Sequence, residues 1–258
     1  MNKLLEVKNI VKKFGGLTAV NNFSLDVNKN EMVGLIGPNG AGKTTCLNLI
    51  TAFLKPNAGK IFFEEQDITK LSSNKKACKG IVRTFQANNV FKDMTVEENI
   101  LIGSHNSEGV GFWDPIISLF GNKHKEAVED KTEQIVNDMN LAEYRNIRAG
   151  SLPHGFQRLL GIAVALTAHP KLLLLDEPFT GMITEEAELL VSIIKKLRMQ
   201  NEISIIMVEH NMRAVMELCD RIVVLNFGSK IAEGIPVEIQ NNKEVIEAYL
   251  GVDEGEFV

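Results

Sequence analysis

Apolar and polar positions alternate along the first part of the chain, a pattern typical of half-buried β-strands. By contrast, the runs 32-MVGLI-36 and 172-LLLL-175 are short and apolar throughout, as expected of strands that are buried on both faces of a sheet. The first of these runs ends at Gly37-Pro38, a pair typical of turns. We therefore predict strands over residues 4–14, 23–27, 32–36, 60–68, 80–85, 171–176, 203–210 and 221–228.

Helical periodicity replaces this alternation in the middle of the chain. From about Thr95 to Ala149 the patterns are helical, for example in 126–141, where Ile135 and Met139 lie on or near one face. Strands that alternate with helices indicate a mostly parallel sheet covered on both faces, with a helical lobe inserted between its halves and a small antiparallel sheet at the N-terminus. The other predicted helices are 43–53, 184–200 and 211–219.

The composition is that of one folded body. The chain has 258 residues, of which 45% are hydrophobic and 24% charged. A net charge of −5 gives no basic surface for nucleic acid, so no nucleic-acid partner is predicted. The N-terminal stretch MNKLLEVKNIVKKF carries charges throughout and is unlike a signal peptide. No apolar run approaches the ~20 residues of a membrane span, so we expect any role at a membrane to come through partners.

The strongest chemical signal is 37-GPNGAGKTT-45, which follows a predicted strand, precedes a predicted helix and matches the phosphate-binding pattern G-x-x-x-x-G-K-[ST]. Glycines let backbone N–H groups converge on phosphate oxygens, and the helix N-terminus adds the positive end of its dipole. Lys43 would supply positive charge to the β- and γ-phosphates, and the Thr44 hydroxyl would bind Mg²⁺. An unrelated glycine-rich turn is the alternative. The predicted nucleotide-binding residues are Gly37, Pro38, Asn39, Gly40, Ala41, Gly42, Lys43, Thr44 and Thr45.

A second element is 172-LLLLDEP-178. Asp176 stands at the carboxyl end of this predicted strand, where it would hold the Mg²⁺ at the ligand-binding edge of the sheet. Glu177 follows it and is placed to act as the general base on the attacking water. Taken alone, an Asp-Glu pair after a strand is more often a strand cap than a site. Its position downstream of a complete phosphate loop favours the site.

With both motifs in this order, the chain resembles the ATP-binding subunit of an ABC transporter over nearly its whole length. The resemblance implies a P-loop NTPase (RecA-like) α/β fold, an ATPase activity, and ATP and Mg²⁺ as cofactors. It also implies that Phe14 stacks on adenine, that Gln86 links Mg²⁺ and the attacking water to the membrane partner, and that His210 contacts the γ-phosphate. Taken singly, Phe14 would be a core residue, Gln86 a solvated amide and His210 a structural residue at a strand end.

The same resemblance implies bounds for the subdomains of the chain and indicates a branch of the family. It implies a single ABC ATPase domain over 1–258, with the core and antiparallel sheet in 1–92 and 158–240, a helical subdomain in 93–157 and a C-terminal tail in 241–258. The stretches KKFGGLTAVNNFSLDV, GIVRTFQ, MTVEENILIG and EVIEAYLG are most similar to subunits that power branched-chain amino-acid uptake. Uptake of urea, amides or other amino acids is the alternative. The apolar segment 112-FWDPIISLF-120 either packs on the helical lobe or contacts a membrane subunit.

Where the family commonly has Leu-Ser-Gly-Gly-Gln-Gln-Arg, this chain has 152-LPHGFQR-158. It keeps Leu152, Gly155, Gln157 (the second Gln) and Arg158, and it lacks the Ser, the first Gly and the first Gln. In ABC dimers this loop closes over ATP bound to the other subunit. Proline has no N–H to donate, and a His adds bulk where the backbone should approach closely, although its ring could itself donate. Ile183 likewise replaces a family Asp or Asn that contacts the partner. The predicted degenerate signature is Leu152, Pro153, His154, Gly155, Phe156 and Gln157.

Both departures alter what this chain offers to a partner, whereas the residues expected to act on its own ATP are intact. One interpretation is an asymmetric heterodimer in which ATP on this chain's phosphate loop is hydrolysed and the reciprocal site is weak. The other is that this branch of the family tolerates variation in the signature.

The resemblance also implies an assembly. It contains two transmembrane permease subunits, a second ABC ATPase subunit in a hetero- or homodimer and, indirectly, an extracytoplasmic solute-binding protein. The chain would be peripheral, on the cytoplasmic face of the cell membrane, with 87-ANNVFKDM-94 as the candidate docking groove for a permease. The three widely spaced cysteines are expected to be reduced, which fits that location.

Two other classes of function are alternatives. A DNA-associated ABC ATPase would carry long coiled coils or a zinc module in place of the helical lobe, and the sequence resembles neither. A regulator that binds ATP without hydrolysing it would suit the imperfect signature, but Glu177 and His210 argue against it.

Overall fold

The computed structural model describes residues 3–84, 90–107, 121–201 and 203–250. The strands are β1 (Lys3–Phe14), β2 (Leu17–Asn28), β3 (Met32–Ile36), β4 (Ala58–Phe63), β5 (Gln66–Asp67), β6 (Ile81–Arg83), β7 (Leu172–Asp176), β8 (Ser204–Val208), β9 (Arg221–Asn226) and β10 (Ser229–Gly234). The helices are α1 (Lys43–Ile50), α2 (Ser73–Ala77), α3 (Val96–Ser107), α4 (Gly121–Asp138), α5 (His154–Leu166), α6 (Thr184–Asn201), α7 (Met212–Leu218), α8 (Pro236–Gln240) and α9 (Lys243–Leu250).

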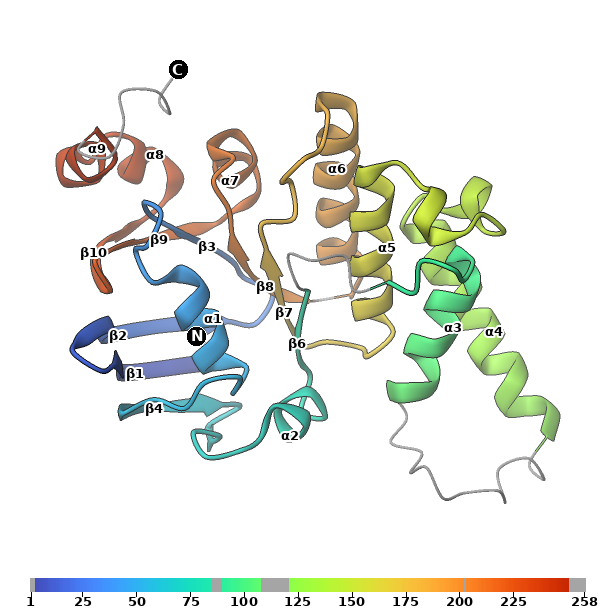
Figure 1. Cartoon of the computed structure of the whole chain (residues 1–258), viewed down its shortest axis with the longest axis horizontal. Coiled ribbons are helices and arrows are strands. Elements are labelled where there is room, and N and C mark those ends of the chain that lie inside the picture. The colour runs from blue at the N-terminus through green and yellow to red at the C-terminus, as the bar shows by residue number, and fades with distance from the viewer. Residues whose placement is uncertain (1–2, 85–89, 108–120, 202, 251–258) are drawn as a thin grey trace.

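Two sheets form the body of the molecule (Figure 1). The larger is six-stranded, in the order β10-β9-β3-β8-β7-β6, and its strands are parallel except for β10 at one edge. The smaller is four-stranded and antiparallel, in the order β2-β1-β4-β5. This arrangement confirms the predicted α/β fold, with a mostly parallel sheet and an antiparallel sheet built from the N-terminal part of the chain.

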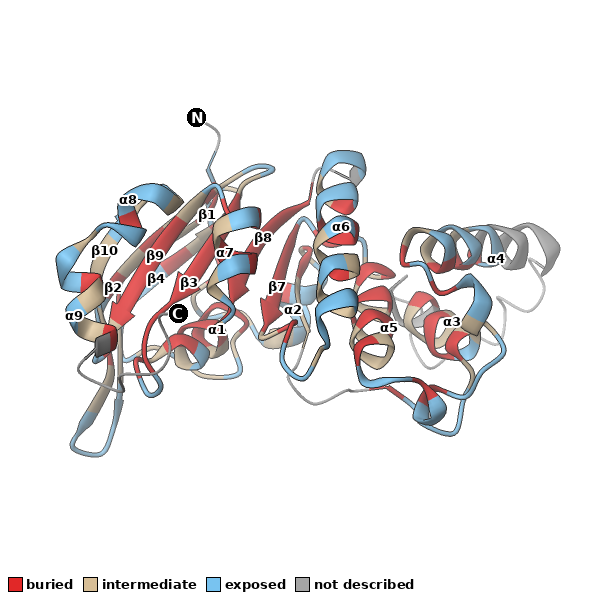
Figure 2. Ribbon diagram, turned by 90° about the horizontal axis from the view of Figure 1, so that it is seen from above, coloured by how far each residue is buried: buried red, intermediate tan, exposed pale blue. Residues whose placement is uncertain are grey.

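The central parallel strands send alternate side chains into two separate cores. From β3, Met32 and Ile36 join the core that includes α5, α6 and α7, whereas Val33 and Leu35 join the core that includes α1 and the antiparallel sheet. Helix α1 thus lies between the two sheets, and α6 and α7 cover the other face of the larger one (Figures 1 and 2). Because both faces are covered, these strands carry apolar residues on both faces along most of their length rather than at every second position.

Helices α3, α4 and α5 form a lobe beside the sheets (Figure 1). Apolar residues from all three helices, together with residues of the parallel sheet, belong to one continuous core. Helix α3 begins with a reciprocal cap, in which the Thr95 N–H donates to Glu98 Oε2 (2.7 Å) and the Glu98 N–H donates to Thr95 Oγ1 (3.2 Å). The predicted border at 157/158 lies inside α5, so this helix contributes to both the lobe and the core of the sheet.

The helix predicted over 43–53 is shorter in the structure. It ends at Ile50, because Ala52 adopts a left-handed backbone conformation with φ 62°. Lys76, in the unpredicted helix α2, is only 1% exposed and donates from Nζ to the carbonyl oxygens of Ile50 (2.8 Å) and Leu49 (3.4 Å). Burial lowers the pKa of this lysine to about 8. The residues that follow α1 satisfy the carbonyl oxygens of Leu47 and Asn48, whereas that of Ile50 accepts from the side chain of a helix distant in sequence.

The strand predicted over 60–68 was also wrong in part. It is a hairpin of β4 and β5 that turns at Glu64 and Glu65, both of which have positive φ. At the other end of the chain, β10 and α8 were not predicted, and the predicted tail 241–258 contains helix α9, whose Val245 is buried.

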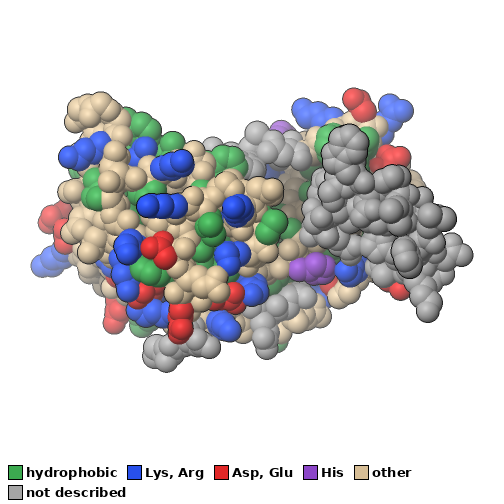
Figure 3. Space-filling view, turned by 90° about the horizontal axis from the view of Figure 1, so that it is seen from below, with side chains coloured by type: hydrophobic (Ala, Val, Ile, Leu, Met, Phe, Trp, Pro, Cys, Tyr) green, Lys and Arg blue, Asp and Glu red, His purple; other side chains and the backbone are tan. Residues whose placement is uncertain are grey.

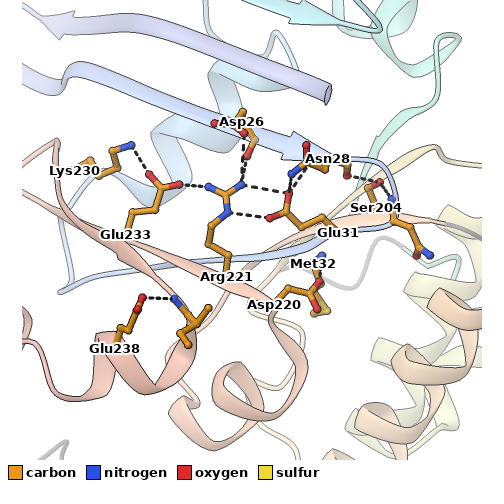
Figure 4. A network of polar contacts seen from close by, with 12 residues as sticks. Asp26, Asn28, Glu31, Met32, Ser204, Asp220, Arg221, Lys230, Glu233 and Glu238 are labelled. Atoms are coloured by element: carbon orange, nitrogen blue, oxygen red, sulfur yellow. Dashed lines mark hydrogen bonds and ion pairs between the residues drawn. The ribbon is translucent and has the colours of Figure 1, made fainter. Parts of the chain in front are cut away.

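Arg221, at the start of β9, joins the two sheets (Figure 4). Its Nε donates to Glu31 Oε1 (2.9 Å), and its Nη2 donates to the carbonyl oxygen of Asp26 in β2 (2.6 Å). It also forms an ion pair with Glu233 in β10. Burial alone would raise the pKa of Glu31 and Glu233, but hydrogen bonds and positive charge, chiefly from Arg221 for Glu31 and from Lys230 for Glu233, outweigh it and lower both pKa values.

Among the residues described, we find no helix that is both long and apolar enough to cross a bilayer. The face drawn in Figure 3 carries Lys and Arg side chains with Asp and Glu side chains among them. Two of the cysteine thiols are buried, and burial raises the pKa of Cys219 to about 12, so this thiol stays protonated at neutral pH.

Candidate nucleotide-binding site

The predicted phosphate loop connects β3 to α1 and lies against the backbone of neighbouring strands. At Gly37 (φ 149°), an added Cβ would stand 2.1 Å from the Leu225 carbonyl oxygen, and at Gly42 (φ 105°) it would stand 2.6 Å from the Ala19 carbonyl oxygen. Only glycine permits this close approach together with these backbone angles. The loop therefore has the tight, glycine-dependent path that the sequence motif predicts.

Lys43 is the first residue of α1, and its side chain is buried within the loop. Its Nζ donates to the carbonyl oxygens of Gly37 (2.6 Å) and Pro38 (3.0 Å), and the residue is 7% exposed. A positive charge and a helix N-terminus at one loop suit the binding of a polyphosphate. Of the other loop residues, Asn39, Gly40 and Thr44 are exposed, Thr45 is half-buried, and Ala41 is buried.

Asp176 is the last residue of β7 and is almost fully buried. Its Oδ2 accepts a hydrogen bond from Arg83 Nη2 at 2.6 Å, with the Arg83 and Asp176 side chains 5% and 1% exposed. Its Oδ1 is buried and has no hydrogen-bond partner among the described residues. An oxygen left in this way is available to a cation.

Glu177 and His210 meet, although they are far apart in the sequence. His210 Nε2 lies 3.2 Å from Glu177 Oε1, and both side chains are partly exposed. Glu177 adopts a left-handed backbone conformation (φ 49°), and its N–H donates to the carbonyl oxygen of Val208 at the end of β8 (2.8 Å). The predicted general base is thus aimed by a strained turn that is fixed to the neighbouring strand.

Glu209, which no sequence motif singles out, connects the two loops that carry these residues. It is 2% exposed, and its Oε1 accepts from the Phe179 N–H (2.8 Å). Its Oε2 accepts from the N–H groups of His210 (2.7 Å) and Asn211 (3.0 Å). One buried carboxylate therefore ties the loop after β7 to the loop after β8. Its position directly before His210 is the only signal for it in the sequence.

The described residues suit Mg²⁺ bound together with a nucleotide. None of them forms a group of three or more His, Cys, Asp or Glu side chains with metal-binding geometry. Mg²⁺ often takes one or two protein oxygens and obtains the rest from phosphates and water. The unpaired Asp176 Oδ1 and the exposed Thr44 hydroxyl are oxygens of the right kind for that mode of binding.

Phe14 lies at the tip of the hairpin formed by β1 and β2 and is 46% exposed, with Lys12 Nζ 5.1 Å from its ring centroid. It is therefore not a core residue. Farther along the returning strand, Ala19 touches the phosphate loop at Gly42, so the hairpin and the loop are neighbours. Gln86, the third predicted landmark, lies outside the described residues.

The predicted signature lies at the start of α5, and part of it is engaged within the chain. Gln157 donates to the Leu152 carbonyl oxygen (2.9 Å), and the Phe156 ring packs on Tyr144 with centroids 4.3 Å apart. The exposed members are Pro153 and His154. Figures 1 and 2 show α5 well separated from α1, so the signature does not reach the phosphate loop of its own chain.

Gly155 is buried beneath a carboxylate from α6. An added Cβ at Gly155 would stand 2.3 Å from Glu186 Cδ, so a larger residue would displace this contact. Glu186 Oε2 also accepts from the Ile183 N–H (3.3 Å), and the Ile183 side chain is 62% exposed. The two segments that depart from the family pattern are thus in contact with the same side chain.

Known proteins with similar sequences are also ATP-binding proteins, as the site described above predicts. The model of the ABC transporter family matches residues 20–180, and the model of the branched-chain amino acid ATP-binding cassette transporter family matches residues 229–255. The chain is 40% identical over 250 residues to BraF, a high-affinity branched-chain amino acid transport ATP-binding protein of Pseudomonas aeruginosa, covering 96% of this chain and 98% of BraF. Identity to LivG of Escherichia coli, which carries the same description, is also 40%, with the same coverage.

Solved structures give the same result. An ATP-binding cassette of an ABC transporter in its ADP conformation superposes with a TM-score of 0.84 and 34% identity, covering 97% of this chain and 100% of that chain. A nucleotide-free cassette gives a TM-score of 0.81 and 35% identity. The fold and the site therefore define an ATP-hydrolysing cassette. This chain belongs to the ABC transporter family, as its ATP-binding component, and the predicted resemblance is confirmed.

Proposed function

We propose that the chain is the Mg²⁺-dependent ATPase subunit of an importer of branched-chain amino acids, and that it works on the cytoplasmic face of the membrane. Its partners in this proposal are two permeases, a second ATPase subunit and, indirectly, a solute-binding protein. The observation that carries the proposal is the 40% identity to BraF and LivG over 96% of the chain. The match of a branched-chain amino acid family model to residues 229–255 also supports it.

The chemistry we propose follows from the contacts of the site. Lys43 and the loop N–H groups bind the phosphates, and Asp176 and Thr44 hold Mg²⁺, which neutralises phosphate charge when bound. Glu177 takes the proton of the attacking water, and the His210 ring, 3.2 Å away, orients that carboxylate and faces the γ-phosphate. Gln86 and Phe14 keep their predicted roles toward water and adenine.

Replacing Glu177 with Gln tests the assignment of the general base. The amide cannot accept the proton, so we expect turnover in the assembled complex to fall by about 10²-fold or more while ATP still binds. Turnover and nucleotide binding are measured on the same preparations. Near-normal turnover of Glu177→Gln would refute the assignment.

The substrate class is tested by reconstituting the chain with its permeases, second ATPase subunit and solute-binding protein in vesicles. We expect leucine, isoleucine or valine to stimulate ATP hydrolysis and to accumulate. Stimulation by urea or an amide alone would favour the alternative substrate class. A complex that binds ATP but hydrolyses none under any of these conditions would favour a regulator without turnover.

The signature supports an asymmetric pair of ATPase subunits as one form of this assembly. Pro153 lacks an N–H at the exposed start of α5, and Ile183 places an exposed apolar side chain where the family uses Asp or Asn. In such a pair, the partner's signature would complete the hydrolysis site around the ATP that is bound to this chain's phosphate loop. Tolerance of the altered signature within a symmetric pair is the competing explanation.

A further inference from the structure

Arg83 connects the strand that carries Asp176 with the helix that carries the phosphate-binding lysine. It is the last residue of β6, which pairs in parallel with β7, and its side chain is 5% exposed. Nη2 donates to Asp176 Oδ2 at 2.6 Å, and Nη1 donates to Asn48 Oδ1 at 2.6 Å. Asn48 belongs to α1, which begins at Lys43. One guanidinium therefore bridges α1 and β7.

The geometry of this bridge fixes how the Asp176 carboxylate is turned. A guanidinium is a rigid planar fork, so two bonds made from its two nitrogens set both its own orientation and that of the groups it binds. Because Oδ2 is used by Arg83, Oδ1 is the oxygen left over, and it is buried without a hydrogen-bond partner among the described residues. Packing in the shared core holds β7 near α1, but without the bridge the Asp176 carboxylate could rotate about its side-chain bonds.

We propose that Arg83 is a positioning residue for the metal: it holds Asp176 so that one carboxylate oxygen faces the Mg²⁺ of the bound nucleotide, in fixed relation to α1. The inference rests on the proposed role of Asp176 as a metal ligand. Charge alone predicts the opposite effect, because a guanidinium beside a carboxylate weakens the attraction of that carboxylate for a cation. The sign of the effect on metal affinity therefore decides between orientation and charge.

The test is the affinity of the full chain for Mn²⁺, a paramagnetic substitute for Mg²⁺, titrated by electron paramagnetic resonance at a fixed saturating ADP concentration. Residues that orient a metal ligand typically contribute about tenfold or more to metal affinity, so we expect the Mn²⁺ dissociation constant to rise by about tenfold in Arg83→Met. Arg83→Lys keeps the charge but cannot bridge both partners, so we expect a rise of about threefold or more. ADP affinity measured with EDTA should stay unchanged in both variants.

Controls separate folding and charge from orientation. Arg213→Gln removes an exposed arginine whose pair with Glu188 is well solvated, and it should leave Mn²⁺ affinity unchanged. Arg83→Met leaves a buried carboxylate unpaired and can unfold the chain, in which case Arg83→Lys and Asn48→Ala decide the question. Asn48→Ala removes only the anchor on α1 and should weaken Mn²⁺ binding less than Arg83→Met does.

The outcomes distinguish this inference from the proposed function. If Asp176→Asn leaves Mn²⁺ affinity unchanged, the proposed metal role of Asp176 fails and the inference falls with it. If Asp176→Asn abolishes Mn²⁺ binding while the Arg83 and Asn48 variants bind as the unchanged chain does, or more tightly, then only the inference is overturned. Weaker Mn²⁺ binding in Arg83→Lys and Asn48→Ala, with normal unfolding transitions, supports it.

Discussion

Asp176 and Glu209 are both carboxylates shielded from water at the ends of neighbouring strands, and each is satisfied by a different kind of partner. Asp176 is paired with a guanidinium, whereas Glu209 accepts N–H groups of the backbone. The first arrangement leaves one oxygen for a cation. The second uses both oxygens to join two loops, so its role is to hold the Glu177–His210 pair together rather than to take part in the chemistry.

Replacing Glu209 with Gln is predicted to lower kcat more than it changes KM for ATP. The amide presents an NH₂ group to one set of N–H donors, so one of the two loops loses its acceptor and the Glu177–His210 distance of 3.2 Å is no longer held. Misplacing a catalytic group by about 1 Å costs about 10²-fold in rate. Steady-state kinetics in the complex, well below the unfolding temperature, measures both constants.

Glu217→Gln is the matched control, because Glu217 is an exposed residue of α7 that pairs with Lys195. It should leave both constants unchanged. An unchanged kcat in Glu209→Gln, accompanied only by a lower melting temperature, would show that Glu209 is structural and does not position the catalytic pair.

At this scale the sequence predicted the motif residues but not their supports. Lys43, Asp176 and Glu177 stand in patterns whose spacing follows from the chemistry of phosphate and metal binding. Arg83 and Glu209 act through contacts with residues distant in sequence, and neither has a spacing rule that would select it.

Helices and strands, like the site residues, were predicted where local sequence determines them and missed where contacts with distant residues do. The central strands were predicted from their uninterrupted apolar runs, which two-sided burial requires. The end of α1 was not predicted, because Ala52 adopts a left-handed backbone conformation (φ 62°) and the last carbonyl oxygen, that of Ile50, accepts from Lys76 in α2. The hairpin at Glu64 and Glu65 was also missed, because neither residue is a usual choice for a turn with positive φ.

The junction of the two sheets gives a prediction for stability. Arg221→Met removes the guanidinium from Glu31 and Glu233, and we expect it to lower the free energy of unfolding by about 2 kcal/mol at pH 7, below the value for a fully buried pair because the side chains are partly solvated. Both carboxyl pKa values are lowered in the folded chain, so their contribution is present above their unfolded pKa of about 4.3 and is lost as pH falls through the lower folded values. The difference between the two proteins should therefore shrink between about pH 5 and pH 3.

Denaturant unfolding of the unchanged chain, Arg221→Met and the exposed control Arg213→Met at several pH values measures this. The control should differ from the unchanged chain by less than about 0.5 kcal/mol throughout. A difference for Arg221→Met that stays constant from pH 7 to pH 3 would contradict an ionic junction and indicate loss of apolar packing by the arginine stem instead.

At the scale of the whole molecule, the candidate docking groove 87–94 is only partly described. Val90 is 9% exposed, so little of its side chain is available to a permease. Phe91 is 56% exposed, and its backbone is fixed by Asn99, whose side chain accepts from the Phe91 N–H and donates to the Phe91 carbonyl oxygen. Phe91 is thus an apolar side chain displayed on an ordered turn at the start of the helical lobe.

Phe91→Asp is predicted to separate ATP hydrolysis from transport. A charged side chain cannot enter an apolar contact with a permease, so we expect stimulation of ATPase activity by the permeases, and uptake, to be lost while nucleotide binding persists. Met199→Asp, which changes an 84% exposed apolar residue on α6, is the control and should have no effect. Unchanged stimulation in Phe91→Asp would show that this turn is not part of the docking surface.

The chain presents a complete phosphate loop and an intact Glu177–His210 pair, but its own signature is distant from that loop and is altered. We therefore infer that ATP bound here is hydrolysed only when a partner completes the site. The most direct test is ATP hydrolysis by the purified chain, alone and then assembled with its permeases and second ATPase subunit. We expect a rate at least about 10²-fold lower for the chain alone, since an electrostatic donor missing from such a site costs that much. An equally high rate for the chain alone would show that LPHGFQ serves as a working signature between two copies of this chain, and would refute the need for a different partner.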